Sequence, residues 1–156
     1  MSEINVNISD AGLDNLPAIL SLQKLAYHSE AQLLNDFTIP PMTQTLEGII
    51  ADFNDGIMLK ASIPSNPDEI IGSVRGKVSQ NTLFVGKLIV HPSFQNQGIG
   101  TALLSSIEQR YPGMRYELFT SEKSIKSLHI YHKNGYREFK REPLNQEFSL
   151  VFLQKS

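Results

Sequence analysis

The sequence predicts a single mixed α/β domain, in which strands and helices form a layered core. Its 156 residues suit one domain, residues 1–156, and the 40% hydrophobic and 19% charged composition is ordinary for a globular protein. Apolar periodicity predicts the element order β-α-α-β-β-β-α-β-α-β-β. At the centre of this order, over residues 83–107, an apolar strand enters a glycine-containing loop that opens directly into a helix.

The N-terminal half contributes a strand and two helices. Alternating apolar residues over 4–8 (Ile4, Val6 and Ile8) predict the first strand. An apolar stripe then predicts a helix over about residues 13–28. The stretch 28–45 is less regular, and its adjacent prolines are expected to block helix continuation. A short second helix follows, from residue 46 to about residue 56.

The C-terminal part alternates strands with two further helices. One helix begins beyond Gly98 and stops before Pro112-Gly113, and the other runs over 124–134 and ends at Gly135, a good left-handed C′ residue. Turn residues separate the apolar runs that predict the remaining strands. These strands are expected at residues 57–63, 70–78, 83–90, 116–120, 137–141 and 147–154.

Charge and composition exclude several classes of function. A net charge of −2 gives no electrostatic footprint for nucleic acid or for an anionic membrane. The sequence has no apolar run long enough to cross a bilayer and no signal segment, so we expect a cytoplasmic protein. With no cysteine and four scattered histidines, it predicts no disulfide, no cysteine nucleophile and no metal site.

The glycine loop at residues 95–100 predicts a phosphate site. The first amides of a helix have no intrahelical partner, and glycines let an anion reach them. The helix dipole adds partial positive charge at the same point. A nucleotide P-loop would need a lysine after Gly100, where the chain has Thr101. A dinucleotide fingerprint would need glycine at Leu103, so NAD(P) binding is a weaker alternative.

The spacing Gln95-x-x-Gly98-x-Gly100 resembles the Gln/Arg-x-x-Gly-x-Gly/Ala signature of the GNAT superfamily of N-acetyltransferases. A second segment, Tyr131-x-Lys133-x-Gly135-Tyr136, resembles the end of the closing helix in that family. The resemblance covers nearly the whole chain and is strongest over residues 83–136. It implies a GNAT-like fold with a central, mostly antiparallel mixed sheet flanked by helices. It also implies acetyl-CoA as acyl donor, no metal, and a primary amine of a small molecule or peptide as acceptor.

The resemblance assigns roles to individual residues. The amides of the glycine loop are expected to bind the pyrophosphate, and the main chain of the central strand is expected to pair with the pantetheine arm. A polar stripe on the last helix faces the same arm and ends in a tyrosine that would protonate the leaving thiolate. The catalytic residue is thus Tyr131, and the cofactor-binding residues are Leu88, Ile89, Val90, Gln95, Asn96, Gln97, Gly98, Ile99, Gly100, Thr101, Ser124 and Ser127.

The general base is left open by the sequence. Many members of the family carry a glutamate on the central strand where this chain has Gly86, so Glu117, Glu122, His91 or water are alternatives. A non-catalytic acyl-CoA-binding module is the second functional hypothesis, and a homodimer is possible.

The acceptor is not identified by the sequence. The region of the first two helices is expected to cover its groove. There Glu30 and Asp36 could attract a cationic amine or could simply belong to a solvated polar connector.

Overall fold

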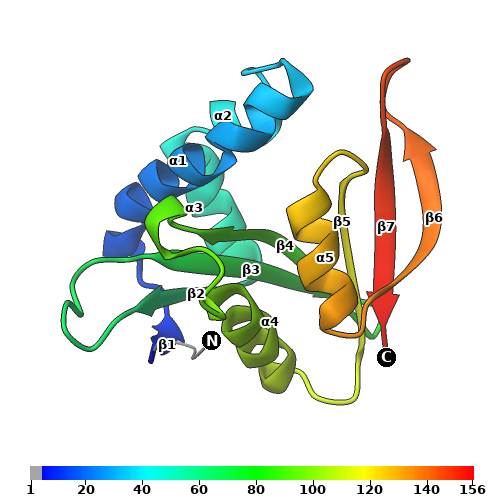
Figure 1. The fold of residues 1–156 in the computed structure, drawn as a ribbon. Coiled ribbons are helices and arrows are strands. Elements are labelled where there is room, and N and C mark those ends of the chain that lie inside the picture. The colour runs from blue at the N-terminus through cyan, green and yellow to red at the C-terminus, as the bar shows by residue number, and fades with distance from the viewer. Residues whose placement is uncertain (1–4) are drawn as a thin grey trace.

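The computed structural model describes residues 5–156, which form a seven-stranded sheet in the order β1-β2-β3-β4-β5-β7-β6 (Figure 1). Neighbouring strands are antiparallel except for β4 and β5, which run parallel. This is the mixed, mostly antiparallel sheet that the sequence predicted. The strands are β1 (Asn7–Asp10), β2 (Ile57–Ser62), β3 (Gly72–Ser79), β4 (Thr82–Val90), β5 (Arg115–Ser121), β6 (Arg137–Pro143) and β7 (Ser149–Lys155).

Helices cover both faces of the sheet, so the core has two halves. On one face, Leu16, Ile19 and Ile49 pack against Met58 and Ile89 of the sheet. On the other face, a larger cluster joins the apolar side of α4 to the middle strands and includes three buried tyrosines, Tyr116, Tyr131 and Tyr136. The helices are α1 (Leu16–Leu34), α2 (Pro40–Thr43), α3 (Leu46–Asp55), α4 (Ile99–Arg110) and α5 (Ile125–Lys133), with short 3-10 turns η1 (Leu13–Asn15) and η2 (Pro92–Phe94).

The first helix differs most from the sequence-based prediction. It extends to Leu34 rather than ending near residue 28, because Ala31 and Leu34 continue its buried face into the core. Asn35 then ends it in the left-handed conformation, at φ 51°. No helix continues through the two prolines from the N-terminal side: α1 ends before them, and Pro40 starts the separate short helix α2, where a missing amide costs little. Ile4, part of the predicted first strand, lies outside the described residues.

The pairing of β4 with its neighbours opens the sheet at one end. It pairs with β5 over only three residues, Thr82 to Phe84, so the two strands diverge beyond that point. On its other edge β4 carries a bulge opposite β3, where Lys87 takes a positive φ of 43°. The splay leaves the last residues of β4 without a neighbouring strand on the β5 side.

Within residues 5–156, no helix has the length and apolarity that crossing a bilayer would require. Across the same span, His, Asp and Glu side chains form no group of three that could hold a metal ion.

Candidate active site

A cavity of about 780 Å³ occupies the gap between the diverging ends of β4 and β5. This volume lies within the range of about 300–1,000 Å³ that small-molecule sites have. Helix α1 forms one wall, and the start of α4 together with α5 forms the opposite wall. Every residue that the sequence predicted for the site lines this cavity, although those residues come from three separate segments of the chain. Their roles stay predictions at this point.

The loop before α4 has the backbone geometry of an open helix start. Asn96 and Gly98 both take positive φ, at 63° and 86°. Asparagine is among the non-glycine residues that tolerate this conformation best. The first amide of α4 that bonds back into the helix is that of Ala102, which donates to the Gly98 carbonyl at 3.0 Å. The amides of Ile99 and Gly100 therefore precede the helical ladder at the cavity wall.

Gly100 leaves space at this wall. A Cβ there would meet methyl groups of Leu88 and Ile130 at 3.8 Å, which is ordinary contact. The neighbouring Thr101 hydroxyl accepts a hydrogen bond from the side-chain amide of Asn134 at 3.1 Å. This bond ties the start of α4 to the end of α5, so these two parts of the cavity wall are fixed to each other.

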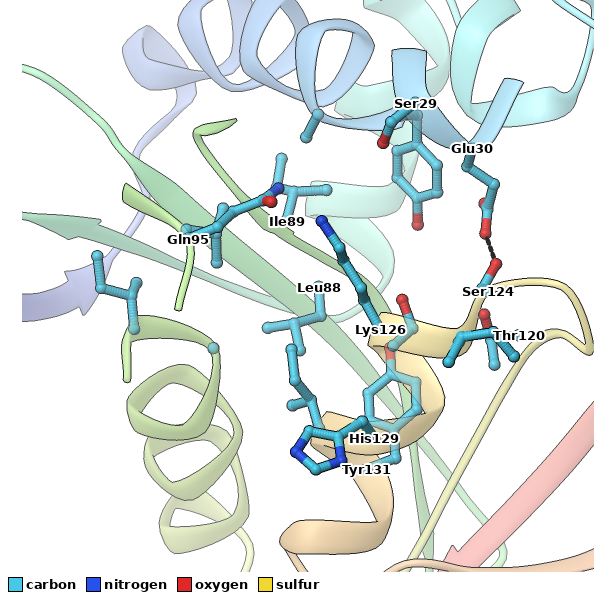
Figure 2. A pocket seen from close by; sticks show the side chains of 18 of the residues that line it. Ser29, Glu30, Leu88, Ile89, Gln95, Thr120, Ser124, Lys126, His129 and Tyr131 are labelled. Atoms are coloured by element: carbon cyan, nitrogen blue, oxygen red, sulfur yellow. Dashed lines mark hydrogen bonds between the residues drawn. The ribbon is translucent and has the colours of Figure 1, made fainter. Parts of the chain in front are cut away.

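Tyr131 lies on α5 with its ring buried and its hydroxyl opening into the cavity (Figure 2). The ring centroid is 6.1 Å from that of Tyr136. Among the described residues, the hydroxyl makes no side-chain hydrogen bond, and no fully buried side-chain polar atom lacks a partner. The oxygen is therefore not sealed in the core. Burial, followed by the negative charge of Glu30, raises the pKa of Tyr131 above its usual value, so the phenol is protonated at neutral pH.

The α1 wall carries residues that sequence reasoning missed or left undecided. Tyr27 and Glu30 lie one turn apart and both face the cavity. The Glu30 carboxylate accepts a hydrogen bond from the Ser124 hydroxyl, which joins α1 to the start of α5 (Figure 2). Ser124 thus has a protein partner already. Burial is also the main cause that raises the pKa of Tyr27.

A lysine on the opposite wall was also missed. Lys126 belongs to α5 and extends across the cavity towards β4 (Figure 2). Lys126 lies in the same helical turn as the predicted serines. Nothing in the sequence around it distinguishes it from a lysine that points into solvent. Its ammonium adds positive charge to the cavity.

The three side chains considered as bases in the sequence lie outside the cavity. Glu117 pairs with Arg115 at 2.5 Å, and Glu122 accepts from the Ser149 amide at 2.5 Å. His91 accepts from the Ser93 amide through Nδ1 at 3.0 Å and caps η2. Gly86 does line the cavity, and a Cβ there would meet nothing within 4 Å. Glu117, Glu122 and His91 are therefore not placed to take a proton from a molecule in the cavity.

Comparison with known proteins gives a family for this architecture. The acetyltransferase (GNAT) domain model matches residues 56–138, which is more than half of the chain. No curated protein matches the chain by sequence.

Solved structures agree along the full length. The PaiA N-acetyltransferase of Thermoplasma acidophilum, in complex with coenzyme A, has a TM-score of 0.76 at 16% identity, covering 98% of this chain and 99% of its own. A GNAT-family acetyltransferase of Streptococcus agalactiae has a TM-score of 0.78 at 17% identity, covering 96% and 94%. The ribosomal-protein-S18-alanine N-acetyltransferase of Escherichia coli has a TM-score of 0.76 at 14% identity, covering 97% and 93%. At these identities, the structural similarity establishes the fold alone. The match to the domain model over more than half of the sequence shows that the chain belongs to the GNAT acetyltransferase family.

Proposed function

We propose that this protein is an N-acetyltransferase that moves the acetyl group of acetyl-CoA directly to a primary amine, and that residues 1–156 act as one domain. The observation that carries the proposal is the meeting of two features in one cavity. The open amides at the start of α4 and the Tyr131 hydroxyl both face it. Such a site offers an anion cradle at one end and a proton donor at the other.

The donor is proposed to lie along the cofactor-side wall. Its pyrophosphate would accept hydrogen bonds from the amides between Gln95 and Gly100, with Thr101 at the edge of the cradle. Its pantetheine arm would run beside the unpaired edge of β4, from Leu88 to Val90, where β5 has diverged. Lys126 extends across the cavity towards the same strand, and its ammonium suits an anionic group of the donor. Ser127 remains a candidate for the arm, whereas the Ser124 hydroxyl is already engaged by Glu30.

The residues of the cavity suit direct transfer. The chain has no cysteine to carry the acetyl group. The neutral amine attacks the thioester carbonyl carbon, the carbon–nitrogen bond forms, and the carbon–sulfur bond breaks with its electron pair going to sulfur. The Tyr131 phenol gives its proton to that sulfur, and the phenolate regains a proton from the newly acylated nitrogen. From the neutral amine, the overall products are the amide and CoA thiol, with Tyr131 protonated again. The proton that reaches solvent is the one that the ammonium form of the acceptor loses before attack.

A substitution at Gly100 tests the cradle. The valine in Gly100→Val projects branched methyl groups from the wall where we place the phosphate, so we expect CoA affinity measured by calorimetry to fall at least tenfold. Gly100→Ala is the matched control, because its methyl would make only ordinary contacts at 3.8 Å and should leave binding nearly unchanged. Unchanged CoA affinity in the valine variant would contradict the cradle.

The transfer itself needs a second measurement. Thiol release from acetyl-CoA, followed with a panel of primary amines, should rise above hydrolysis for at least one amine. CoA binding without amine-dependent thiol release would instead favour the non-catalytic acyl-CoA-binding module, for which Gly86 in place of an acid is the supporting observation.

A further inference from the structure

Among the described acidic residues, Glu30 differs from the others in its position at the cavity. Within residues 5–156, it is the one carboxylate that lines the cavity. It sits on α1, opposite the proposed donor wall, and its carboxylate is held by the Ser124 hydroxyl (Figure 2). Asp36, the other acid considered from the sequence, does not line the cavity and instead accepts from the Thr38 amide at 2.8 Å.

The surroundings of Glu30 leave its negative charge available to a ligand. No lysine or arginine of the described chain forms an ion pair with it. Glu30 lies one turn of α1 from Tyr27, and its partner Ser124 begins the helix that carries Tyr131, so these side chains line the same part of the site. The carboxylate is therefore near the hydroxyl that we place at the sulfur.

The lysines around the cavity do not cancel this charge. Lys87 lies 3.8 Å from the Asp52 carboxylate, and Lys123 packs over the Phe148 ring at 5.6 Å. The other two lining lysines, Lys126 and Lys133, belong to α5; Lys126 extends across the cavity towards β4, and neither forms an ion pair with Glu30. The α1 side is thus the acidic side of the cavity.

The mouth of the cavity has an apolar rim. Leu33 of α1 and Phe119 of β5 both line the cavity, yet they are 58% and 57% exposed. Phe119 points away from the buried face of β5 and stacks against Phe152 of the neighbouring strand, with ring centroids 5.4 Å apart. Large apolar side chains at the mouth of a cavity are suited to contact a ligand.

We propose that Glu30, Leu33 and Phe119 form the acceptor subsite, and that it selects a primary alkylammonium bearing an apolar or aromatic group. The proposal rests on the acetyltransferase function proposed above and names its substrate class. Glu30 binds the ammonium near Tyr131, and the apolar rim receives the substituent. The hydrogen bond from Ser124 keeps the carboxylate turned into the cavity. The amine then loses a proton to water before it attacks.

Three amines separate the contributions of charge and ring. At pH 7, 2-phenylethylamine offers both an ammonium and a ring, ethylamine offers the ammonium alone, and aniline offers a ring with an uncharged amine. The wild-type kcat/KM should be highest for 2-phenylethylamine. In Glu30→Gln it should fall on the order of 10- to 100-fold for both alkylamines, the range of a lost charge-assisted hydrogen bond, with aniline and the KM for acetyl-CoA unchanged.

The variants carry their own controls. The glutamine oxygen can still accept from Ser124, so Glu30→Gln should fold with an unchanged melting temperature. Asp36→Asn removes a nearby charge outside the cavity and should leave all three amines unaffected. Phe119→Ala should reduce kcat/KM for 2-phenylethylamine about tenfold and spare ethylamine.

Several outcomes would overturn the acceptor subsite while leaving the acetyltransferase in place. These are equal activity of Glu30→Gln, an equal loss for aniline and the alkylamines, or a wild type that acetylates spermidine but none of the three probes. A wild type that binds CoA and acetylates no amine would instead remove the proposed function, and this subsite with it.

Discussion

Replacing Tyr131 by phenylalanine removes one oxygen from the cavity wall and leaves the packed ring in place. The ring is buried, only 8% of its surface is exposed, and its hydroxyl makes no side-chain hydrogen bond in the described chain. The variant should therefore keep its free energy of unfolding within about 0.5 kcal/mol. A proton donor of this kind contributes about 100- to 10,000-fold in rate, or about 2.7–5.4 kcal/mol of the activation barrier.

Steady-state thiol release with the best acceptor measures that loss. We expect kcat to fall by two to four orders of magnitude, with the affinity for acetyl-CoA nearly unchanged, because the phenol acts on the sulfur only as it leaves. Tyr27→Phe is the matched control, since it removes a phenol oxygen from the acceptor-side wall of the same cavity. Unchanged turnover in Tyr131→Phe, or a larger loss in Tyr27→Phe, would refute the assignment of Tyr131 as proton donor.

Three further predictions concern stability. In Gly56→Ala the new methyl would collide with the carbonyl oxygen of Gly76, and backbone cannot yield cheaply, so the melting temperature should drop sharply or the chain should fail to fold. Arg75→Met would strand the buried Gln23 oxygen to which the guanidinium donates, and urea unfolding should show a loss of about 1–3 kcal/mol. Burial raises the pKa of three tyrosines in the folded chain, Tyr136 among them, where Glu108 adds to the effect. Because the folded state favours the protonated phenols, this stability is complete below the unfolded pKa of about 10 and is lost as the pH rises above it, which melting curves between pH 8 and 11 would show as a declining melting temperature.

Local patterns in the sequence were sufficient to predict the backbone of the glycine loop and of the end of α5. The predicted glycine loop has the expected backbone, with Asn96 and Gly98 at positive φ, and Gly135 also takes the left-handed conformation at φ 93° after α5. These features depend on a few neighbouring residues, because steric limits on φ and the unpaired amides of a helix start are local properties. The observed strand boundaries agree with the predicted ones within one or two residues at most ends, because apolar runs and turn residues are also local features.

The α1 wall of the cavity could not be predicted in the same way. Helix α1 continues past its expected end because Ala31 and Leu34 are buried by residues that are distant in the sequence. Tertiary burial of this kind overrides local propensity. The extension turns Glu30 from a connector residue into part of a helical wall, and its partner Ser124 is 94 residues away. The pattern of apolar residues within α1 therefore gives no indication of that contact.

The position of the acid in the fold follows from what the reaction needs. An ammonium must be held where its nitrogen, once neutral, can approach the thioester carbon, and Coulomb attraction depends on distance within the folded site rather than on the element that supplies the charge. On the central strand, Gly86 lines the cavity without a side chain, and a Cβ there would meet nothing within 4 Å. Glu30 brings the only carboxylate of the described cavity from the opposite wall, and the bond to Ser124 fixes it beside the phenol. Under the proposed acceptor subsite, the acid of this site is supplied by α1 and not by the central strand, and Glu30→Gln is the variant that tests it.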